Sequence, residues 1–180
     1  MGVVIALSGP HGSGKSTYGK MLAEEFNFRH ITIGLIFREM AKEKKLTLEE
    51  FSSYVEKHPE IDKELDERII LEAKKGNNVL IDSQLSAWMT QDLSQVKIYL
   101  TAPTPIRIKR IALRDDVSYE KAEKETLTRE NSEKKRYKEL YNIDISDLSI
   151  YDIIINTNIW SIVSTFEILK VAVIEYLKNH

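Results

Sequence analysis

A glycine-rich run, GPHGSGKS, follows directly on an apolar stretch near the start of the chain. Gly9, Gly12 and Gly14 carry no Cβ, so the backbone at these positions can turn tightly and approach a bound group closely. Backbone N–H groups of such a loop, at the start of a helix, form a cradle for phosphate. We expect Lys15 to reach the β- and γ-phosphates of a nucleoside triphosphate and the Ser16 hydroxyl to coordinate Mg²⁺. The alternative is an ordinary glycine-rich turn between a strand and a helix.

The other residues of this loop are assigned to the same ATP site. Pro10 and Ser13 belong to it as parts of the turn, and Thr17 supplies a second hydroxyl, with the α-phosphate as its expected contact. His11 lies within the loop without an evident partner, and we interpret it as a spacer. An apolar strand before the loop and a helix after it provide the context that the motif requires.

Phosphoryl transfer depends on positioning and on positive charge around the transferring group. Arginine suits this task because its guanidinium binds phosphate bidentately. Arg38 lies one helical turn past the second predicted strand, near the sheet edge where ligands bind in such folds. Arg129, Glu133 and Arg136 are spaced i, i+4 and i+7, so they share one helix face. Each also has a plainer interpretation, as a solvated arginine or as part of a solvated charged face.

Three further residues could take part. Arg110 and Arg114 share a face, with Arg107, on the helix after the fourth predicted strand, although arginines on helix surfaces are common. Asp82 ends the third predicted strand, where a carboxylate beside a phosphate-binding loop can hold Mg²⁺ through water. The alternative for Asp82 is a helix cap or a turn.

Short apolar runs alternate with helical patterns, which predicts an α/β fold with a parallel sheet covered on both faces. The predicted strands are 3–8, 29–33, 79–82, 96–101 and 153–156. The predicted helices are 15–26, 34–44, 47–57, 60–75, 104–115, 118–140 and 160–178. Thr47 and Glu50 have the spacing of a capping box, and Ser118 is a predicted N-cap.

We predict a single domain, 1–180, in which two mostly helical segments interrupt the alternation of strands and helices. Segment 34–77 is expected to bind the acceptor, and segment 113–142 is expected to close as a lid. Closure would exclude water, which competes with the acceptor for the γ-phosphoryl group. The alternative is that both segments only pack against the core. The core itself is predicted to comprise 1–33, 78–112 and 143–180.

The composition excludes several classes of protein. The 180 residues include no cysteine, which excludes disulfides, zinc–thiolate sites and thiol nucleophiles. The net charge is −2 with 30% charged residues, which argues against a general nucleic-acid surface. No basic leader precedes the first apolar run, and no segment approaches about 18 uncharged apolar residues. We therefore expect a cytoplasmic monomer that binds neither nucleic acid nor membrane.

Several motifs together make the chain resemble, nearly from end to end, the archaeal-type cytidylate kinases of the nucleoside monophosphate kinase group. They are SGPHGSGKST (8–17), IFREMA (36–41), HPEID (58–62), RENSEKKRY (129–137) and LSIYDIIINT (148–157). The resemblance implies a P-loop kinase fold with five parallel strands in the order 2-3-1-4-5, a helical acceptor-binding insert and a short lid. It also implies reversible phosphoryl transfer from Mg·ATP to CMP, with dCMP often accepted.

The resemblance assigns roles to individual residues. It implies that Arg38 binds the phosphate of the acceptor and that Arg129 and Arg136 lie near that phosphate and the transferring group. Glu133 is the acidic member between these two arginines. Lys15 and the arginines of the lid are then expected to stabilise the transition state. Arg110 and Arg114 are similar to the lid-base arginines that contact ATP in related kinases.

One departure from the family pattern concerns the acceptor. After the third strand, the relatives have an acidic residue, Gly and then Arg, whereas this chain has Asp82, Ser83 and Gln84. Because that Arg contacts the acceptor nucleotide in the relatives, Gln84 leaves open UMP, AMP or a non-nucleotide as acceptor. A nucleotide-binding switch without acceptor-dependent turnover is a further alternative. Against a GTPase switch, no Asn-Lys-x-Asp sequence follows the fourth strand.

Overall fold

A five-stranded, all-parallel sheet forms the centre of the molecule, and its strand order, β2-β3-β1-β4-β5, confirms the predicted one. The structure is a computed structural model that describes residues 2–179. Its strands are β1 (Val4–Ser8), β2 (Arg29–Thr32), β3 (Val79–Asp82), β4 (Val96–Thr101) and β5 (Ile153–Asn156). Each strand pairs in parallel with its neighbours in the sheet.

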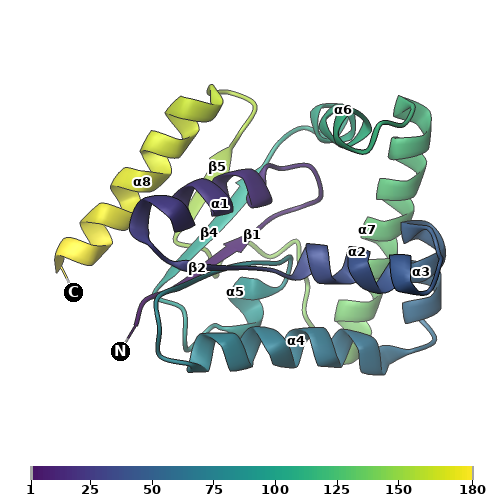
Figure 1. Cartoon of the computed structure of the whole chain (residues 1–180), viewed down its shortest axis with the longest axis horizontal. Helices are drawn as coiled ribbons and strands as arrows, with labels where there is room; N and C mark the ends of the chain where they lie inside the picture. The colour runs from purple at the N-terminus through teal and green to yellow at the C-terminus, as the bar shows by residue number, and fades with distance from the viewer. Residues whose placement is uncertain (1, 180) are drawn as a thin grey trace.

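Alternation along the strands divides the core into two layers. Ile5 and Leu7 of β1 pack with residues of α1 (Lys15–Phe26) and α8 (Ile162–Asn179) on one face. Val4 of the same strand points to the other face, among residues of α2 (Ile33–Glu43), α3 (Leu48–Val55) and α4 (Pro59–Lys74). Figure 1 shows α1 and α8 on one side of the sheet and α4 on the other. A sheet buried on both faces requires such apolar strands, and all five residues of β1 are buried.

The predicted helices are all present, with ends shifted by one to a few residues. The remaining helices are α2 (Ile33–Glu43), α3 (Leu48–Val55), α4 (Pro59–Lys74), α5 (Ser86–Met89), α6 (Thr104–Asp115) and α7 (Tyr119–Tyr141). Thr47 and Glu50 form the predicted capping box, and the Ser118 hydroxyl accepts a hydrogen bond from the N–H of Lys121 as the N-cap of α7. Pro59 is the first residue of α4 rather than a residue outside it, since the first helical position needs no N–H donor.

Helix α5 was not predicted, because four residues are too few to show a helical period. Its position depends instead on contacts with residues that are far away in the sequence. The Ser86 hydroxyl donates to the carbonyl of Leu7 (3.1 Å) and hydrogen-bonds the Ser8 hydroxyl (2.9 Å), both in β1. These bonds hold the chain that follows β3 close to the carboxyl end of the central strand.

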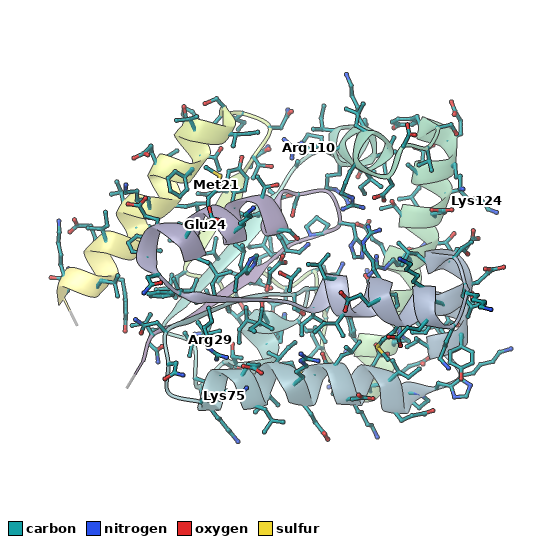
Figure 2. All side chains as sticks on the ribbon, in the orientation of Figure 1. Met21, Glu24, Arg29, Lys75, Arg110 and Lys124 are labelled. Atoms are coloured by element: carbon teal, nitrogen blue, oxygen red, sulfur yellow. The ribbon has the colours of Figure 1, made fainter. Side chains whose placement is uncertain are left out.

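The two helical segments, 34–77 and 113–142, lie side by side at one end of the molecule. Helix α7 packs along α3 (Figure 1), and ion pairs join them: Lys124 to Glu49 (3.5 Å) and Lys135 to Glu56 (3.7 Å). At the sheet end of α4, Glu72 joins the labelled Arg29 and Lys75 (Figure 2), at 2.8 and 2.7 Å. No helix within residues 2–179 combines the length and apolar character needed to cross a membrane.

Candidate active site

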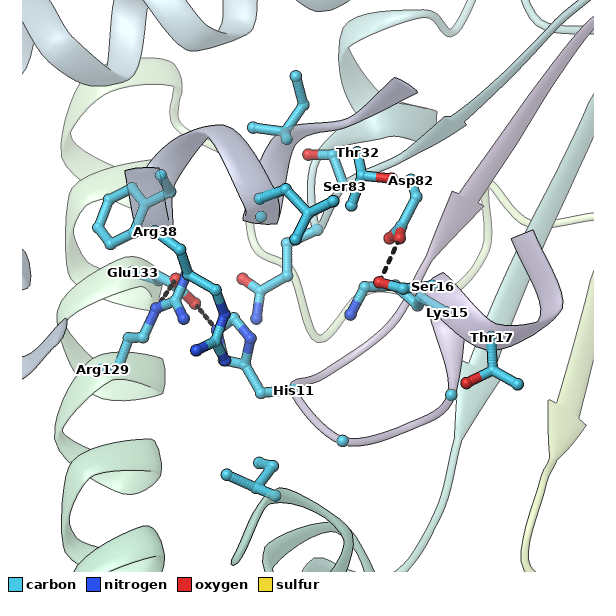
Figure 3. A pocket seen from close by; sticks show the side chains of 18 of the residues that line it. His11, Lys15, Ser16, Thr17, Thr32, Arg38, Asp82, Ser83, Arg129 and Glu133 are labelled. Carbon is cyan, nitrogen blue, oxygen red and sulfur yellow. Dashed lines mark hydrogen bonds and ion pairs between the residues drawn. The ribbon is translucent and has the colours of Figure 1, made fainter. Parts of the chain in front are cut away.

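A pocket of about 550 Å³ lies at the carboxyl edge of the sheet, between the glycine-rich loop and helix α7 (Figure 3). Ligands bind at this edge in open α/β folds. The predicted site residues that line it are His11, Gly12, Gly14, Lys15, Ser16, Thr17, Arg38, Asp82, Gln84, Arg110, Arg114, Arg129, Glu133 and Arg136. Gly9, Pro10 and Ser13 do not line it. The structure thus brings residues from five separate parts of the chain to one cavity.

The glycines of the loop have the backbone conformations expected of them. Gly9, Gly12 and Gly14 have φ values of 144°, 76° and 101°, which residues with a side chain rarely adopt. A Cβ on Gly12 would lie 2.5 Å from the carbonyl oxygen of Arg107, and one on Gly9 would collide with the carbonyl oxygen of Leu100. Both the loop conformation and the close packing of its neighbours therefore require glycine.

Lys15 is the first residue of α1, and its ammonium group is held against the loop. Its Nζ donates to the carbonyl oxygens of Gly9 (2.7 Å) and Pro10 (3.1 Å). Burial lowers the pKa of Lys15, while the charge of Asp82 opposes this shift. A cation held only by neutral carbonyls in a buried site has a strong remaining attraction for an anion.

Ser16 and Asp82 are in direct contact, as a metal site at this position needs. The Ser16 hydroxyl donates to Oδ2 of Asp82 at 2.7 Å (Figure 3). Burial raises the pKa of Asp82, and the charge of Lys15 works against that effect. Mg²⁺ prefers oxygen donors and takes one or two protein ligands together with phosphate oxygens and water. Ser16 and Asp82 fit this pattern, and residues 2–179 hold no group of three or more His, Cys, Asp or Glu side chains suited to a metal ion.

His11 is not a spacer, and that interpretation was wrong. Its Nε2 lies 2.7 Å from Oε2 of Glu133 on α7, so the loop and the helix are joined across the pocket (Figure 3). Burial lowers the pKa of His11 to about 4, which leaves the imidazole neutral at physiological pH. Burial alone would raise the pKa of Glu133, but His11 and the charges of Arg129 and Arg136 lower it to about 2. The partner lies 122 positions away, beyond the reach of any local pattern.

A second link between the same loop and α7 was also missed. Arg107 of α6 is buried, and its Nη1 donates to the carbonyl of His11 (2.8 Å) and to Oε1 of Glu130 (2.5 Å). The same carboxyl oxygen of Glu130 accepts the backbone N–H of His11 (3.2 Å). Arg107 was noted only as a member of a helix face, yet it fixes the backbone of the loop from behind.

Arg38 of α2 and Arg129 of α7 both line the pocket. Arg129 donates from Nε to Oε1 of Glu133 (3.0 Å), and its guanidinium lies 4.6 Å from the centre of the Phe37 ring. Arg38 lies at 3.5 Å from Asp115, with about a third of its side chain exposed. Figure 3 shows Arg38, Arg129 and His11 grouped opposite Lys15. The positive charges of Arg38 and Arg129 therefore face the same cavity as the phosphate-binding loop.

Arg136 lies further along the same face of α7 and is paired with α4. Its Nε donates to Oδ2 of Asp62 at 2.7 Å, and its Nη1 donates to the Ser132 hydroxyl at 2.5 Å. One turn later on α4, Oδ2 of Asp66 accepts the hydroxyl of Tyr141 at 2.8 Å. Asp62 and Asp66 both line the pocket, as does Tyr137.

Asp62 and Asp66 were not among the predicted site residues, although the sequence carries a signal for them. The two carboxylates are four residues apart, next to the apolar stripe of Ile61, Leu65 and Ile69 that faces the core. Acidic residues are rarely buried without a partner. Two acidic residues beside a stripe that faces the core therefore indicate that each has a functional role or a hydrogen-bonding partner.

Arg110 and Arg114 line the pocket on the α6 side. Arg110 donates from Nη1 to the Thr157 hydroxyl (2.8 Å) and from Nη2 to the Thr157 carbonyl (3.0 Å), and so links α6 to the chain after β5. Arg114 makes a bidentate contact with Asp115 at 2.8 and 2.7 Å. Arg110 is thus already engaged with the protein, whereas Arg114 is about half exposed.

Gln84 follows β3 and lines the pocket, as its relation to the acceptor site would require. Its Oε1 is buried and has no hydrogen-bond partner within residues 2–179. A buried acceptor without a donor is costly, so the oxygen is available to a ligand that brings one.

Comparison with known proteins gives a consistent result over the whole chain. The model of the family described as "Cytidylate kinase-like family" matches residues 4–159. The cytidylate kinase of Staphylothermus marinus is 48% identical over 98% of this chain and 99% of its own length. That of Pyrococcus horikoshii is 49% identical over 95% of this chain and 88% of its own length.

Solved structures resemble the fold at much lower identity. Shikimate kinase from Bacteroides thetaiotaomicron has a TM-score of 0.60 at 14% identity, with 95% of this chain and 98% of that chain covered. Shikimate kinase from Acinetobacter baumannii, in complex with shikimate, has a TM-score of 0.58 at 18% identity, with 97% and 95% covered. At such identity the likeness concerns the fold alone, and it agrees with a P-loop kinase architecture.

Proposed function

The chain belongs to the cytidylate kinase-like family, and from this premise we propose that it transfers the γ-phosphoryl group of ATP to CMP. The products are ADP and CDP, and dCMP is a second acceptor. One observation carries the proposal: a single pocket is lined both by the phosphate-binding loop and by Arg38, Arg129 and Arg136. A site for a nucleoside triphosphate alone has no use for this second group of cations.

On the donor side, the loop binds the phosphates of ATP. The Nζ of Lys15 exchanges the carbonyls of Gly9 and Pro10 for the β- and γ-phosphate oxygens, and the Thr17 hydroxyl contacts the α-phosphate. Arg110 and Arg114 extend the donor site along α6. Glycine at 12 and 14 keeps the backbone N–H groups close to the phosphates.

On the acceptor side, Arg38 and Arg129 hold the phosphate of CMP. The guanidinium groups neutralise its charge and place one oxygen in line with the γ-phosphorus. Glu133 and the Phe37 ring fix the position of Arg129, and His11 in turn holds Glu133. Arg136 is kept in place by Asp62 and adds positive charge to the same wall of the pocket, further along α7.

Ser16 and Asp82 would hold Mg²⁺, with the rest of its ligands supplied by phosphate oxygens and water. When bound, the ion neutralises charge on the β- and γ-phosphates. The residues of the protein do the remaining work: they orient the two substrates and exclude water from the γ-phosphoryl group.

We assign acceptor binding to segment 34–77 and lid closure to segment 113–142. The lining of the pocket supports this assignment, because α2 and α4 of the first segment and α7 of the second all contribute residues to it. We also propose that the enzyme acts as a monomer in the cytoplasm and needs neither nucleic acid nor membrane.

A coupled assay of ADP formation with CMP, dCMP, UMP, AMP and GMP tests the proposal. The expected result is a kcat/KM for CMP at least about tenfold above those for UMP, AMP and GMP, and turnover that requires Mg²⁺. Failure to form ADP in the presence of CMP would refute the proposed acceptor. ADP formation at one rate with or without any acceptor would instead identify a nucleoside triphosphatase.

A further inference from the structure

Helices α4 and α7 face one another along the pocket and meet at two pairs of side chains. Asp62 binds Arg136, and Asp66 binds Tyr141, one turn further along both helices. Arg129 and Tyr137 both line the pocket, and their positions on α7 are about 12 Å apart along the helix axis, at 1.5 Å per residue. This is comparable to the distance from the phosphate to the far edge of the base in an extended nucleoside monophosphate. A phosphate held at Arg129 therefore directs the base toward Asp66.

The two carboxyl groups of α4 differ in their partners. Asp62 is paired with a guanidinium, whereas Asp66 receives only the neutral hydroxyl of Tyr141, at Oδ2. Within residues 2–179 the carboxyl group accepts one side-chain hydrogen bond, from Tyr141, and the residue is only 7% exposed and lines the pocket. Burial, with the nearby charge of Asp62, raises the pKa of Asp66 to about 7, as expected for a carboxylate that lacks a cation. Asp66 thus has unused capacity to accept a hydrogen bond from a ligand.

Gln84 provides a second, independent observation of the same kind. It lies on the segment after β3, on a different part of the pocket wall, and its buried Oε1 has no donor within residues 2–179. Two acceptor groups with unused capacity in one pocket indicate a ligand with N–H groups on its base edge.

We propose that Asp66 reads the acceptor base by accepting an N–H from the amino group on C4 of cytosine. Uracil carries a carbonyl oxygen at C4, so a carboxylate facing it would leave two acceptors opposed without a proton between them. Sites built to bond one partner in this way discriminate strongly against the analogue that lacks the donor. Asp66 is therefore a specificity-determining residue, and the inference rests on the proposed acceptor, CMP.

The test is Asp66→Asn, which keeps the shape of the side chain and can still accept from Tyr141. Its amide N–H₂ can then face the pocket, so the group offered to the base changes from acceptor to donor. At pH 8, where the native carboxyl is ionised, we expect kcat/KM for CMP to fall and that for UMP to rise. The ratio of the two is expected to drop by at least about tenfold, as the loss of one hydrogen bond and the gain of a mismatch imply. The KM for ATP should stay within about twofold, because Asp66 lies away from the phosphate-binding loop in the sequence and in the proposed binding mode.

The matched control is Glu64→Gln, the same acid-to-amide change on the solvent face of α4. Its CMP-to-UMP ratio should equal that of the wild type. An unchanged ratio in Asp66→Asn, with a native KM for ATP, would overturn the inference while the proposed kinase activity stands. Absence of CMP turnover in the wild type would instead refute the proposed function itself.

If Asp66→Asn does not fold, Asp66→Glu tests the same inference, because it keeps the charge and displaces the carboxylate by one methylene. The expected result is again a lower kcat/KM for CMP with the KM for ATP preserved. A native kcat/KM for CMP in this variant would contradict a direct contact with the base.

Discussion

Each cation of the pocket is held in place by oxygen atoms of the protein that a phosphate could replace or supplement. Lys15 is held by two carbonyls, Arg38 by Asp115 and Arg129 by Glu133. These contacts keep the positive groups from repelling one another and from turning outward into solvent. They also place the groups before any substrate arrives, so less conformational entropy is lost on binding.

Lys15 offers the most direct test at the scale of a residue. For Lys15→Ala we expect kcat to fall by about 10²–10³, because a preorganised positive group at the transferring phosphoryl is removed. The affinity for CMP should change by less than about threefold, since Lys15 serves the donor. A coupled assay and calorimetric titration of CMP measure these two quantities.

The matched control for this prediction is Lys20→Ala, on the same helix. Lys20 is largely exposed, and among the described residues its one ion pair is with Glu24, at 3.8 Å. Its kcat should equal that of the wild type. A similar loss of kcat in both variants would mean that Lys15 contributes only to the stability of α1.

The residues of the site were predictable where a short motif or a fixed spacing defines them. The loop glycines, Lys15 and Ser16 follow from one motif, because backbone geometry and phosphate chemistry restrict each position. His11 was not predictable, since its partner Glu133 is brought to it only by the fold. For Asp66, the spacing with Asp62 beside the apolar stripe of α4 was a signal of burial, but its partner Tyr141 lies 75 positions away and is brought to it only by the fold.

At the scale of elements, periodicity was sufficient for the long helices and for the buried strands. Helix α5 lies outside this rule, because tertiary hydrogen bonds from Ser86 rather than a repeating pattern hold it. Helix α7 is a different case: its composition is that of a solvated helix, yet Arg129, Glu133 and Arg136 on one face are buried. The spacing of these three residues predicted a shared face, the family resemblance predicted that it binds a ligand, and the structure places it at the pocket.

Alanine substitutions at two glycines can separate the effect of backbone strain from the effect of a steric clash between the added Cβ and a neighbouring carbonyl. Gly12 and Gly76 have similar φ values, 76° and 72°, so an alanine at either position is strained by about 1 kcal/mol. A Cβ on Gly12 would lie 2.5 Å from the carbonyl of Arg107, whereas one on Gly76 would meet no atom of residues 2–179 within 4 Å. We therefore expect Gly12→Ala to raise the Kd for ATP by at least about tenfold and Gly76→Ala to leave it unchanged. Calorimetric titration with ATP measures both, and equal affinities in the two variants would contradict the role of the Gly12 contact.

At the scale of the whole molecule, the sheet order determines which segments can meet. With β1 central, the loop after it lies between the ends of β3 and β4, so Asp82 and the start of α6 flank the glycine-rich loop. The two helical segments then meet beyond this edge, where α7 packs along α3. The order of the strands could be predicted, but the contact between α3 and α7 could not, because it joins two helices that are far apart in the sequence.

The buried charges of the pocket also make stability depend on pH, and Asp66 gives this dependence a sign that can be measured. Its pKa is about 7 in the folded protein and near 3.8 in the unfolded chain, because burial disfavours the ionised form. The charged groups facing it are Asp62 and Arg136, and Tyr141 supplies its hydrogen bond. A group whose pKa is higher in the folded protein than in the unfolded chain stabilises the fold in its protonated form, and this stabilisation is complete at pH values below the pKa of the unfolded chain. It is lost as pH rises through the folded pKa, so this loss falls between about pH 4 and 7.

The variant Asp66→Asn has no titrating group at this position, so its stability does not decrease with pH for this reason. The free energy of unfolding of this variant, relative to the wild type, should therefore rise from pH 5 to pH 8, by an amount on the order of 2 kcal/mol, and then level off. His11 and Glu133 titrate in both proteins and cancel in the difference. Urea denaturation at several pH values measures it, with Glu64→Gln as the control that should give a flat difference. A flat difference for Asp66→Asn as well would mean that the carboxyl is already ionised at pH 5, with a donor or cation beside it, and its spare capacity for a base would then be lost.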